Sequence, residues 1–202
     1  SITGSTGGST VYYFLYNWEV QSKEVVAESA RVPVVAEVVN GVVVDVKAFL
    51  EGPFDENTGM MHDSLRVAAL VPLDQPFTAL GYATSTDGGN SIGAGLLAVT
   101  GNSAIVDWVR VELRSSGSPT TVVASQHGVL TRNGQVLSTS GSPMRFNVAN
   151  GSYYVTVRHR NHLGAMTGAT VPLSASAATV DFTQSSTSTW GTNARKPKGT
   201  KQ

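Results

Sequence analysis

The chain has 202 residues, of which 41% are hydrophobic and only 14% are charged, and its formal net charge at pH 7 is zero. Gly, Ser, Thr and Val take the place of the missing charged residues, which favours strands and tight turns over helices. Because the chain contains no cysteine, a thiol nucleophile, a cysteine-bound zinc and an iron–sulfur cluster are excluded.

Positive charge is concentrated at the end of the chain. The last eight residues carry four of the 14 lysines and arginines and no acid, so the rest of the chain holds ten basic against 14 acidic side chains. An acidic body argues against nucleic acid as a partner, and no segment has the apolar length of a membrane-spanning helix. We therefore expect residues 192–202 to be a basic tail or linker, with no nucleic-acid partner and no membrane insertion.

Residues 1–40 read as a Gly/Ser/Thr-rich linker followed by a two-stranded β-ribbon. Strand alternation places Tyr12, Phe14, Tyr16 and Trp18 on one face, and a two-stranded ribbon cannot bury such a face alone. The ribbon either packs on its own chain, belongs to the tail of an immunoglobulin-like domain, or is exchanged between copies. Strand exchange of this kind adds copies head to tail and would yield a filament.

The first part of the main region, residues 41–100, predicts a strand over residues 42–50 after the turn Asn40-Gly41. It also predicts the one short helix of the chain over residues 64–70 and a buried strand or strand pair over residues 92–100. Short strands follow over residues 101–191, with hairpin turns at Asn133-Gly134 and Asn150-Gly151.

Together these signals predict an all-β fold: an antiparallel β-sandwich, immunoglobulin- or prealbumin-like, with one short helix and the N-terminal ribbon. The sandwich module would cover residues 41–191, with a division into two sub-lobes, 41–100 and 101–191, left open.

A row of polar side chains is the sharpest candidate binding site. If residues 152–163 are one strand, then Tyr154, Arg158, Arg160 and His162 share its outer face, since side chains alternate. Residues 105–113 form a second strand with valines on one face and charges on the other. Trp108 and Arg110 of that other face extend the site, because forked guanidiniums suit carboxylates and glycans. The alternative is a solvated sheet face, with Glu112 of the neighbouring strand paired to the row.

Metal and catalytic signals are weaker. Calcium is the one metal that the sequence leaves open, at Asp55, Asn57, Asp63 or Asp87, but these are ordinary turn residues without the EF-hand spacing. We expect no other cofactor. No Gly-x-Ser-x-Gly motif and no carboxylate pair stands out, so the chain is expected not to be an enzyme.

Several segments resemble a known module. They are residues 47–54 (KAFLEGPF), 61–66 (MHDSLR), 98–102 (AVTGN), 105–114 (IVDWVRVELR) and 152–164 (SYYVTVRHRNHLG). Together, over residues 43–191, they resemble an uncharacterised module near the C-terminus of large Bacteroidota surface proteins. Those proteins look like type IX secretion cargo, and some are described as adhesins or hemagglutinins.

The resemblance implies an extracellular or cell-surface location and no catalytic residues. We expect a structural or adhesive module whose partners are neighbouring copies or other surface proteins. The alternative is a carbohydrate-binding module of a large secreted protein, with glycans as ligands.

Overall fold

The computed structural model describes residues 41–197. The expectations for the aromatic row Tyr12, Phe14, Tyr16 and Trp18 and for the ribbon of residues 1–40 lie outside these residues. Within them the fold is mostly β: a nine-stranded, largely antiparallel sheet, a separate two-stranded hairpin and two short α-helices. The predicted all-β class is therefore confirmed in this coarse form.

Most strands are short, and the two longest, β4 and β5, lie at the centre of the large sheet. In chain order they are β1 (Val42–Lys47), β2 (Phe54–Asp55), β3 (Met60–Met61), β4 (Ile105–Ser115), β5 (Ser118–Thr131), β6 (Gln135–Ser138), β7 (Met144–Phe146), β8 (Gly151–Arg158), β9 (Ala165–Met166), β10 (Val171–Leu173) and β11 (Ala178–Asp181). The helices are α1 (Ser64–Val67) and α2 (Ala94–Leu97), and a 3-10 turn spans Gly101–Ser103.

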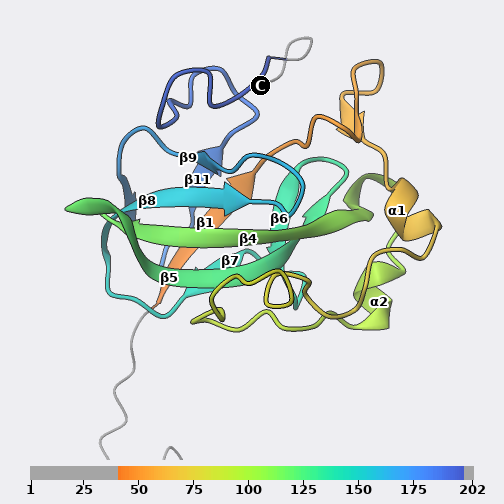
Figure 1. Cartoon of the computed structure of the whole chain (residues 1–202), viewed down its shortest axis with the longest axis horizontal. Helices are drawn as coiled ribbons and strands as arrows, with labels where there is room; N and C mark the ends of the chain where they lie inside the picture. The colour runs from red at the N-terminus through yellow and green to blue at the C-terminus, as the bar shows by residue number, and fades with distance from the viewer. Residues whose placement is uncertain (1–40, 198–202) are drawn as a thin grey trace, which may run out of the picture. The chain divides into compact units, whose positions relative to one another are not determined.

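The large sheet has the order β10-β8-β4-β5-β6-β1-β11, with β7 paired to β1 and β9 paired to β8. All of its pairs are antiparallel except β1 with β11, which is parallel. Figure 1 shows β8, β4 and β5 on the near side and β1, β7 and β11 behind them. The sheet curls so that the end strand β10 comes close to β1, which is next to the other end: the amide of Val43 on β1 donates to the carbonyl of Ser174, just after β10, at 2.8 Å.

The main core lies inside this curl. On β4, Val109, Val111 and Leu113 point inward, as the alternation predicts, and all three are fully buried. They meet apolar side chains from the strands behind them, among them Val44, Val46, Val136, Phe146 and Val180. One continuous apolar cluster thus holds the front and rear strands together.

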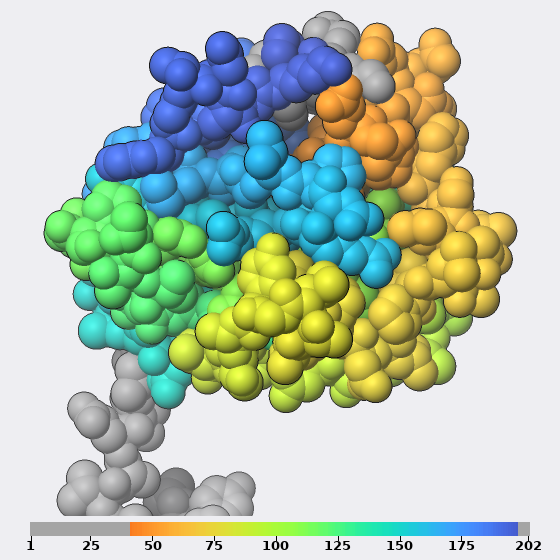
Figure 2. Space-filling model, viewed as in Figure 1, coloured from red at the N-terminus to blue at the C-terminus, as the bar shows by residue number. Residues whose placement is uncertain are grey.

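The outer face of β4 is covered as well, by the long connection between β3 and β4. Side chains of this connection, with Phe77 at the centre, pack on Trp108 and Val129 to form a second cluster. The indole Nε1 of Trp108 donates to the carbonyl of Pro72 at 2.8 Å, so its one polar atom is satisfied. Figure 2 shows part of this connection, in yellow, lying over the face turned to the viewer.

Two expectations for the first part of the region need correction. The predicted strand over residues 92–100 is wrong: this segment contains α2, whose Leu96 and Leu97 pack on the second cluster. An apolar run of this length fits a short helix as well as a strand, and only the neighbouring surface decides between them. The fold therefore has two short helices instead of one, and α1 ends at Val67, earlier than expected.

The two Asn-Gly turns have different outcomes. Asn133-Gly134 joins β5 to β6 in a hairpin, as predicted, and Gly134 has a φ of +85° that suits glycine. The hairpin predicted at Asn150-Gly151 is wrong, because β7 pairs with β1 whereas β8 pairs with β4. None of the helices in residues 41–197 is long and apolar enough to cross a membrane.

Candidate functional site

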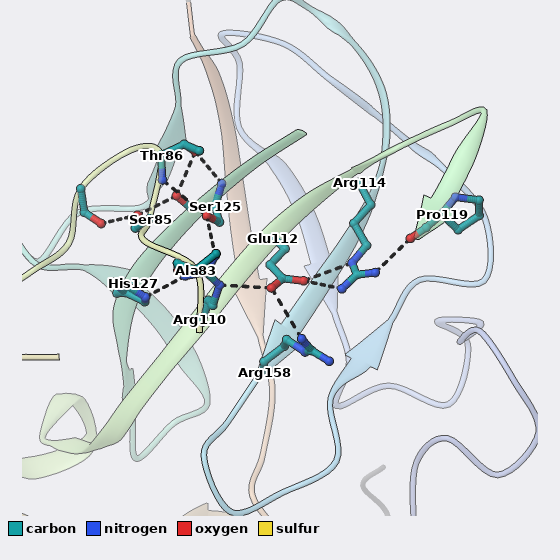
Figure 3. Close-up of polar contacts among 11 residues, drawn as sticks. Ala83, Ser85, Thr86, Arg110, Glu112, Arg114, Pro119, Ser125, His127 and Arg158 are labelled. Atoms are coloured by element: carbon teal, nitrogen blue, oxygen red, sulfur yellow. Dashed lines mark hydrogen bonds and ion pairs between the residues drawn. The ribbon is translucent and has the colours of Figure 1, made fainter. Parts of the chain in front are cut away.

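A groove of about 560 Å³ runs along the outer face of the sheet, where the chain before residue 87 passes over β4. Its lining includes the charged residues Arg110, Glu112, Arg114 and Arg158, and also Leu80 and Tyr82. Figure 3 shows the four charged side chains converging from β4 and β8. We call this feature the arginine groove.

Glu112 lies at the centre of the arginine groove and is only 3% exposed. Its Oε1 accepts a hydrogen bond from Nε of Arg110 at 3.1 Å, and Nη1 of Arg158 lies 3.8 Å from the same oxygen. Its Oε2 accepts bonds from Nε and Nη2 of Arg114, at 3.1 and 2.6 Å. One carboxylate thus holds three guanidiniums, two of them from its own strand and one from β8.

Arg110 forms the floor of the groove, where every direction of its planar fork has a partner. Beside Glu112, its Nη1 donates to the carbonyl of Ala83 at 2.8 Å and lies 2.9 Å from Nε2 of His127, while Nη2 donates to Oγ of Ser125 at 2.8 Å. Arg110 therefore ties the covering segment to β4 and β5. It is held rigidly, which suits a binding surface that is formed in advance.

The arginine groove carries a surplus of positive charge. Three guanidiniums face one carboxylate, and no other acid belongs to the described lining. His127 adds no charge at neutral pH, because burial, and then the charge of Arg110, lowers the pKa of its imidazole to about 4. The groove therefore has a net positive charge of two, which a ligand would neutralise. Because its side chains are partly buried, electrostatic interactions in the groove are stronger than in water.

Arg158 is the most accessible cation of the site, since 42% of its side chain is exposed. Its guanidinium lies 5.7 Å from the centre of the Tyr82 ring, within cation–π range. Further along β8, Tyr154 stands opposite Arg114 and packs edge to face on the half-exposed Trp190, with ring centres 5.5 Å apart. Partly buried tyrosine rings and the exposed Trp190 thus flank the cationic centre.

The predicted row on residues 152–163 is only partly brought together. Tyr154 and Arg158 share the outer face of β8, but the strand ends at Arg158 and residues 160–162 bend. Arg160 therefore turns to the buried Asp107, to which its Nη2 donates at 2.9 Å. His162 turns to His159, with 2.9 Å between their Nδ1 atoms. The prediction that Arg160 and His162 continue the row is wrong, because the strand is shorter than expected.

The predicted positions of Trp108 and Arg110 on an exposed sheet face are also wrong. Trp108 is fully buried under the β3–β4 connection and cannot contact a ligand, whereas Arg110 is 3% exposed yet still lines the groove. The outer face of β4 was expected to be free, and the covering segment buries it. The alternative pairing of Glu112 with the row is confirmed for Arg158.

The three aspartates among the calcium candidates accept hydrogen bonds within the protein, and the fourth candidate, Asn57, contributes its backbone amide to one of them. Asp55 accepts bonds from the amide of Asn57 and the hydroxyl of Thr58, which lower the pKa of its carboxyl, as in an ordinary turn. Asp63 accepts two bonds from Arg66. Asp87 accepts bonds from the hydroxyl of Thr86 and the amide of Asn147. In the part of the chain that is described, no three histidine or acidic side chains converge as metal ligands.

Sequence reasoning missed Tyr82 and Arg114 as parts of the site. Arg114 has a signal: Arg110, Glu112 and Arg114 alternate along one strand, so they share a face and can pair. Tyr82 has none, because it reaches the groove through a connection whose path follows no local pattern.

Comparisons of the chain with protein-family models, with curated proteins and with solved structures find no match. The resemblance to the Bacteroidota surface module stays a prediction, and the chemistry of the site follows from its own residues.

Proposed function

We propose that the chain is a non-enzymatic extracellular binding module that takes an anionic saccharide, carrying carboxylates or sulfates, in the arginine groove. The observation that carries this proposal is the cluster of Arg110, Arg114 and Arg158 around the single carboxylate of Glu112. Guanidiniums bind planar and tetrahedral oxyanions through two parallel hydrogen bonds, which makes arginine the residue of choice for such ligands.

The accessible member of the cluster supports a ligand at this place. Arg158 approaches Glu112 only to 3.8 Å, beyond hydrogen-bond distance, so its donors are not used up by the carboxylate. A ligand oxyanion beside Arg158 would gain charge-assisted bonds there. The half-exposed Trp190, which packs on Tyr154 of β8, offers an apolar ring surface nearby, against which the C–H face of a sugar can pack. Charge and aromatic surface are the combination that an acidic glycan needs.

The single carboxyl group in the groove supports a binding function over catalysis. A glycosidase needs two carboxyl groups with separate roles, and the described lining of the groove holds one. Both oxygens of that carboxylate already accept hydrogen bonds, from Arg110 and from Arg114.

An adhesive role at the cell surface is part of this proposal, as is kinship of the curled sheet with immunoglobulin- or prealbumin-like sandwiches. Neighbouring surface proteins and their glycans are then the partners. Self-assembly through residues 11–39 is a separate hypothesis, whose test is the assembly state after deletion of residues 1–39.

The test is binding of the full chain to polygalacturonate, a polyuronate, compared with dextran, a neutral polysaccharide, at low and high salt. We expect binding to polygalacturonate that weakens as salt rises, and none to dextran. Arg158→Gln should weaken binding about tenfold, because it removes one charge-assisted contact.

Arg145→Gln is the matched control, because Arg145 is an exposed arginine on β7 that does not line the groove. It should leave the affinity unchanged. Equal losses in the two variants, or equal binding of both polysaccharides, would contradict the proposal.

A further inference from the structure

We propose a second binding site, separate from the arginine groove, that takes a phenol: an aromatic ring whose hydroxyl donates a hydrogen bond to Nε2 of His162. The site is a pocket of about 450 Å³ that shares no lining residue with the arginine groove. Its apolar walls include Phe49, Leu50, Phe54, Leu163 and Phe182. We call it the histidine pocket.

Asp107 anchors the polar side of the histidine pocket. Its carboxylate is 2% exposed and accepts bonds from the amide of Trp108 at 2.8 Å, from Nη2 of Arg160 at 2.9 Å and from Nε2 of His159 at 3.1 Å. The bond from His159, the bond from the Trp108 amide and the charge of Arg160 outweigh the effect of burial and lower the pKa of this carboxyl. Asp107 is therefore ionised at neutral pH and accepts hydrogen bonds only.

This carboxylate fixes the tautomer of His159. Its Nε2 faces an acceptor and must carry the proton. Its Nδ1 receives the backbone N–H of Asn161 at 3.1 Å, and a backbone N–H can only donate, so Nδ1 is the unprotonated acceptor. These hydrogen bonds place a proton of His159 on Nε2 and a lone pair on Nδ1.

The tautomer of His159 in turn fixes that of His162. The two Nδ1 atoms lie 2.9 Å apart. The one lone pair of His159 Nδ1 is shared with the amide of Asn161, and a second unprotonated nitrogen at this distance would repel it, so the favoured tautomer of His162 carries its proton on Nδ1. In the neutral ring the lone pair then lies on Nε2 of His162. Burial lowers the pKa of His162 below its ordinary value of 6.5, which keeps this lone pair available at neutral pH. The result is a hydrogen-bond acceptor of fixed identity in the lining of the pocket.

The apolar side chains that line the histidine pocket indicate which kind of hydrogen-bond donor it would bind. Phe49 and Phe54 lie with ring centres 4.7 Å apart and a tilt of 39°, and they form an aromatic wall. Leu163, one residue after His162, is 96% exposed, the highest value among the exposed large apolar side chains of the described region. The described lining also holds the polar side chains of Glu51, Asn161, Asn193, Arg195 and Lys196. An apolar wall with an uncovered leucine on one side and polar groups on the other suits a flat apolar ring that carries a hydroxyl, which is the chemistry of a phenol.

The test is titration of the full chain with p-cresol and with 4-methylanisole, which has the same ring but no hydroxyl proton, followed by ¹⁵N NMR of the histidine side chains. We expect His162 to show an unprotonated Nε2 that shifts with p-cresol, and 4-methylanisole to bind about fivefold more weakly. A third titration, with N-acetyltyrosinamide, shows which molecule supplies the phenol group. Tighter binding than that of p-cresol indicates a tyrosine of a partner protein, and weaker binding indicates a free phenol.

Two variants locate the effect. His162→Ala should bind the two cresol-type ligands equally, whereas His62→Ala, at an exposed histidine outside the pocket, should behave as the unchanged chain. Leu163→Asp should weaken both ligands. A protonated Nε2 on His162, no shift with p-cresol, or equal affinity of the two ligands for the unchanged chain overturns the proposal.

Discussion

Asp107 and His159 are 52 residues apart in the chain, yet Oδ2 of the aspartate lies 3.1 Å from Nε2 of the histidine in the protein interior. The contact follows from the register of β4 with β8, which places Arg110 opposite Arg158. Because the strands are antiparallel, the residues before Arg110 meet those after Arg158. The same register brings Arg158 to Glu112 on the outer face. A single strand pairing thus builds both polar clusters.

Glu112→Gln should destabilise the protein by about 3–5 kcal/mol, because it leaves buried Arg110 without its counter-charge. Urea unfolding at pH 7 measures this change. Glu56→Gln is the control, since Glu56 is exposed in a turn and its replacement should change stability by less than about 0.5 kcal/mol. A loss at Glu112 as small as that at Glu56 would mean that the arginines are held without the carboxylate.

His127 should make the protein less stable on mild acidification. Its pKa falls from an ordinary 6.5 in the unfolded chain to about 4 in the folded one, so between these values the unfolded state binds more protons. Stability is therefore full above about pH 6.5 and falls by roughly 3 kcal/mol as the pH drops to about 4. His127→Gln keeps an acceptor for Arg110 but does not titrate. Its unfolding free energy should be flatter across this range, and a parallel decline in both proteins would refute the assignment.

Gly89→Ala should destabilise the protein more than Gly88→Ala. Both glycines have positive φ, of +85° and +80°, so alanine is strained at either position by about 1–2 kcal/mol. A Cβ at residue 89 would also lie 2.2 Å from the carbonyl oxygen of His127, whereas a Cβ at residue 88 meets nothing within 4 Å. Thermal denaturation of the two variants compares them directly. Equal melting temperatures would show that the covering segment moves away from β5 at little cost.

Leu113→Ala should cost about 2–5 kcal/mol, because Leu113 is fully buried between the front and rear strands and its truncation leaves a cavity. Leu70→Ala removes the same atoms from a side chain that is 63% exposed, and its cost should stay below about 1 kcal/mol. Chemical denaturation of the pair measures the difference. Similar costs would contradict the placement of the core inside the curled sheet.

The sequence by itself determined the strands with clear alternation and the turn between β5 and β6. Val109, Val111 and Leu113 follow a period of two, and this period reports which face is apolar whatever lies against it. These features depend on local geometry, which neighbouring residues in the chain specify on their own.

Only the tertiary structure decided what covers each face. The connection between β3 and β4 buries Trp108 and carries Tyr82 to the arginine groove, and nothing in its local sequence indicates that path. The end of β8 at Arg158, which sends His162 to His159 and away from the row, depends on the buried Asp107 of another strand. A buried carboxylate must be paired to be tolerated, and its partners come from wherever the fold brings a donor within reach.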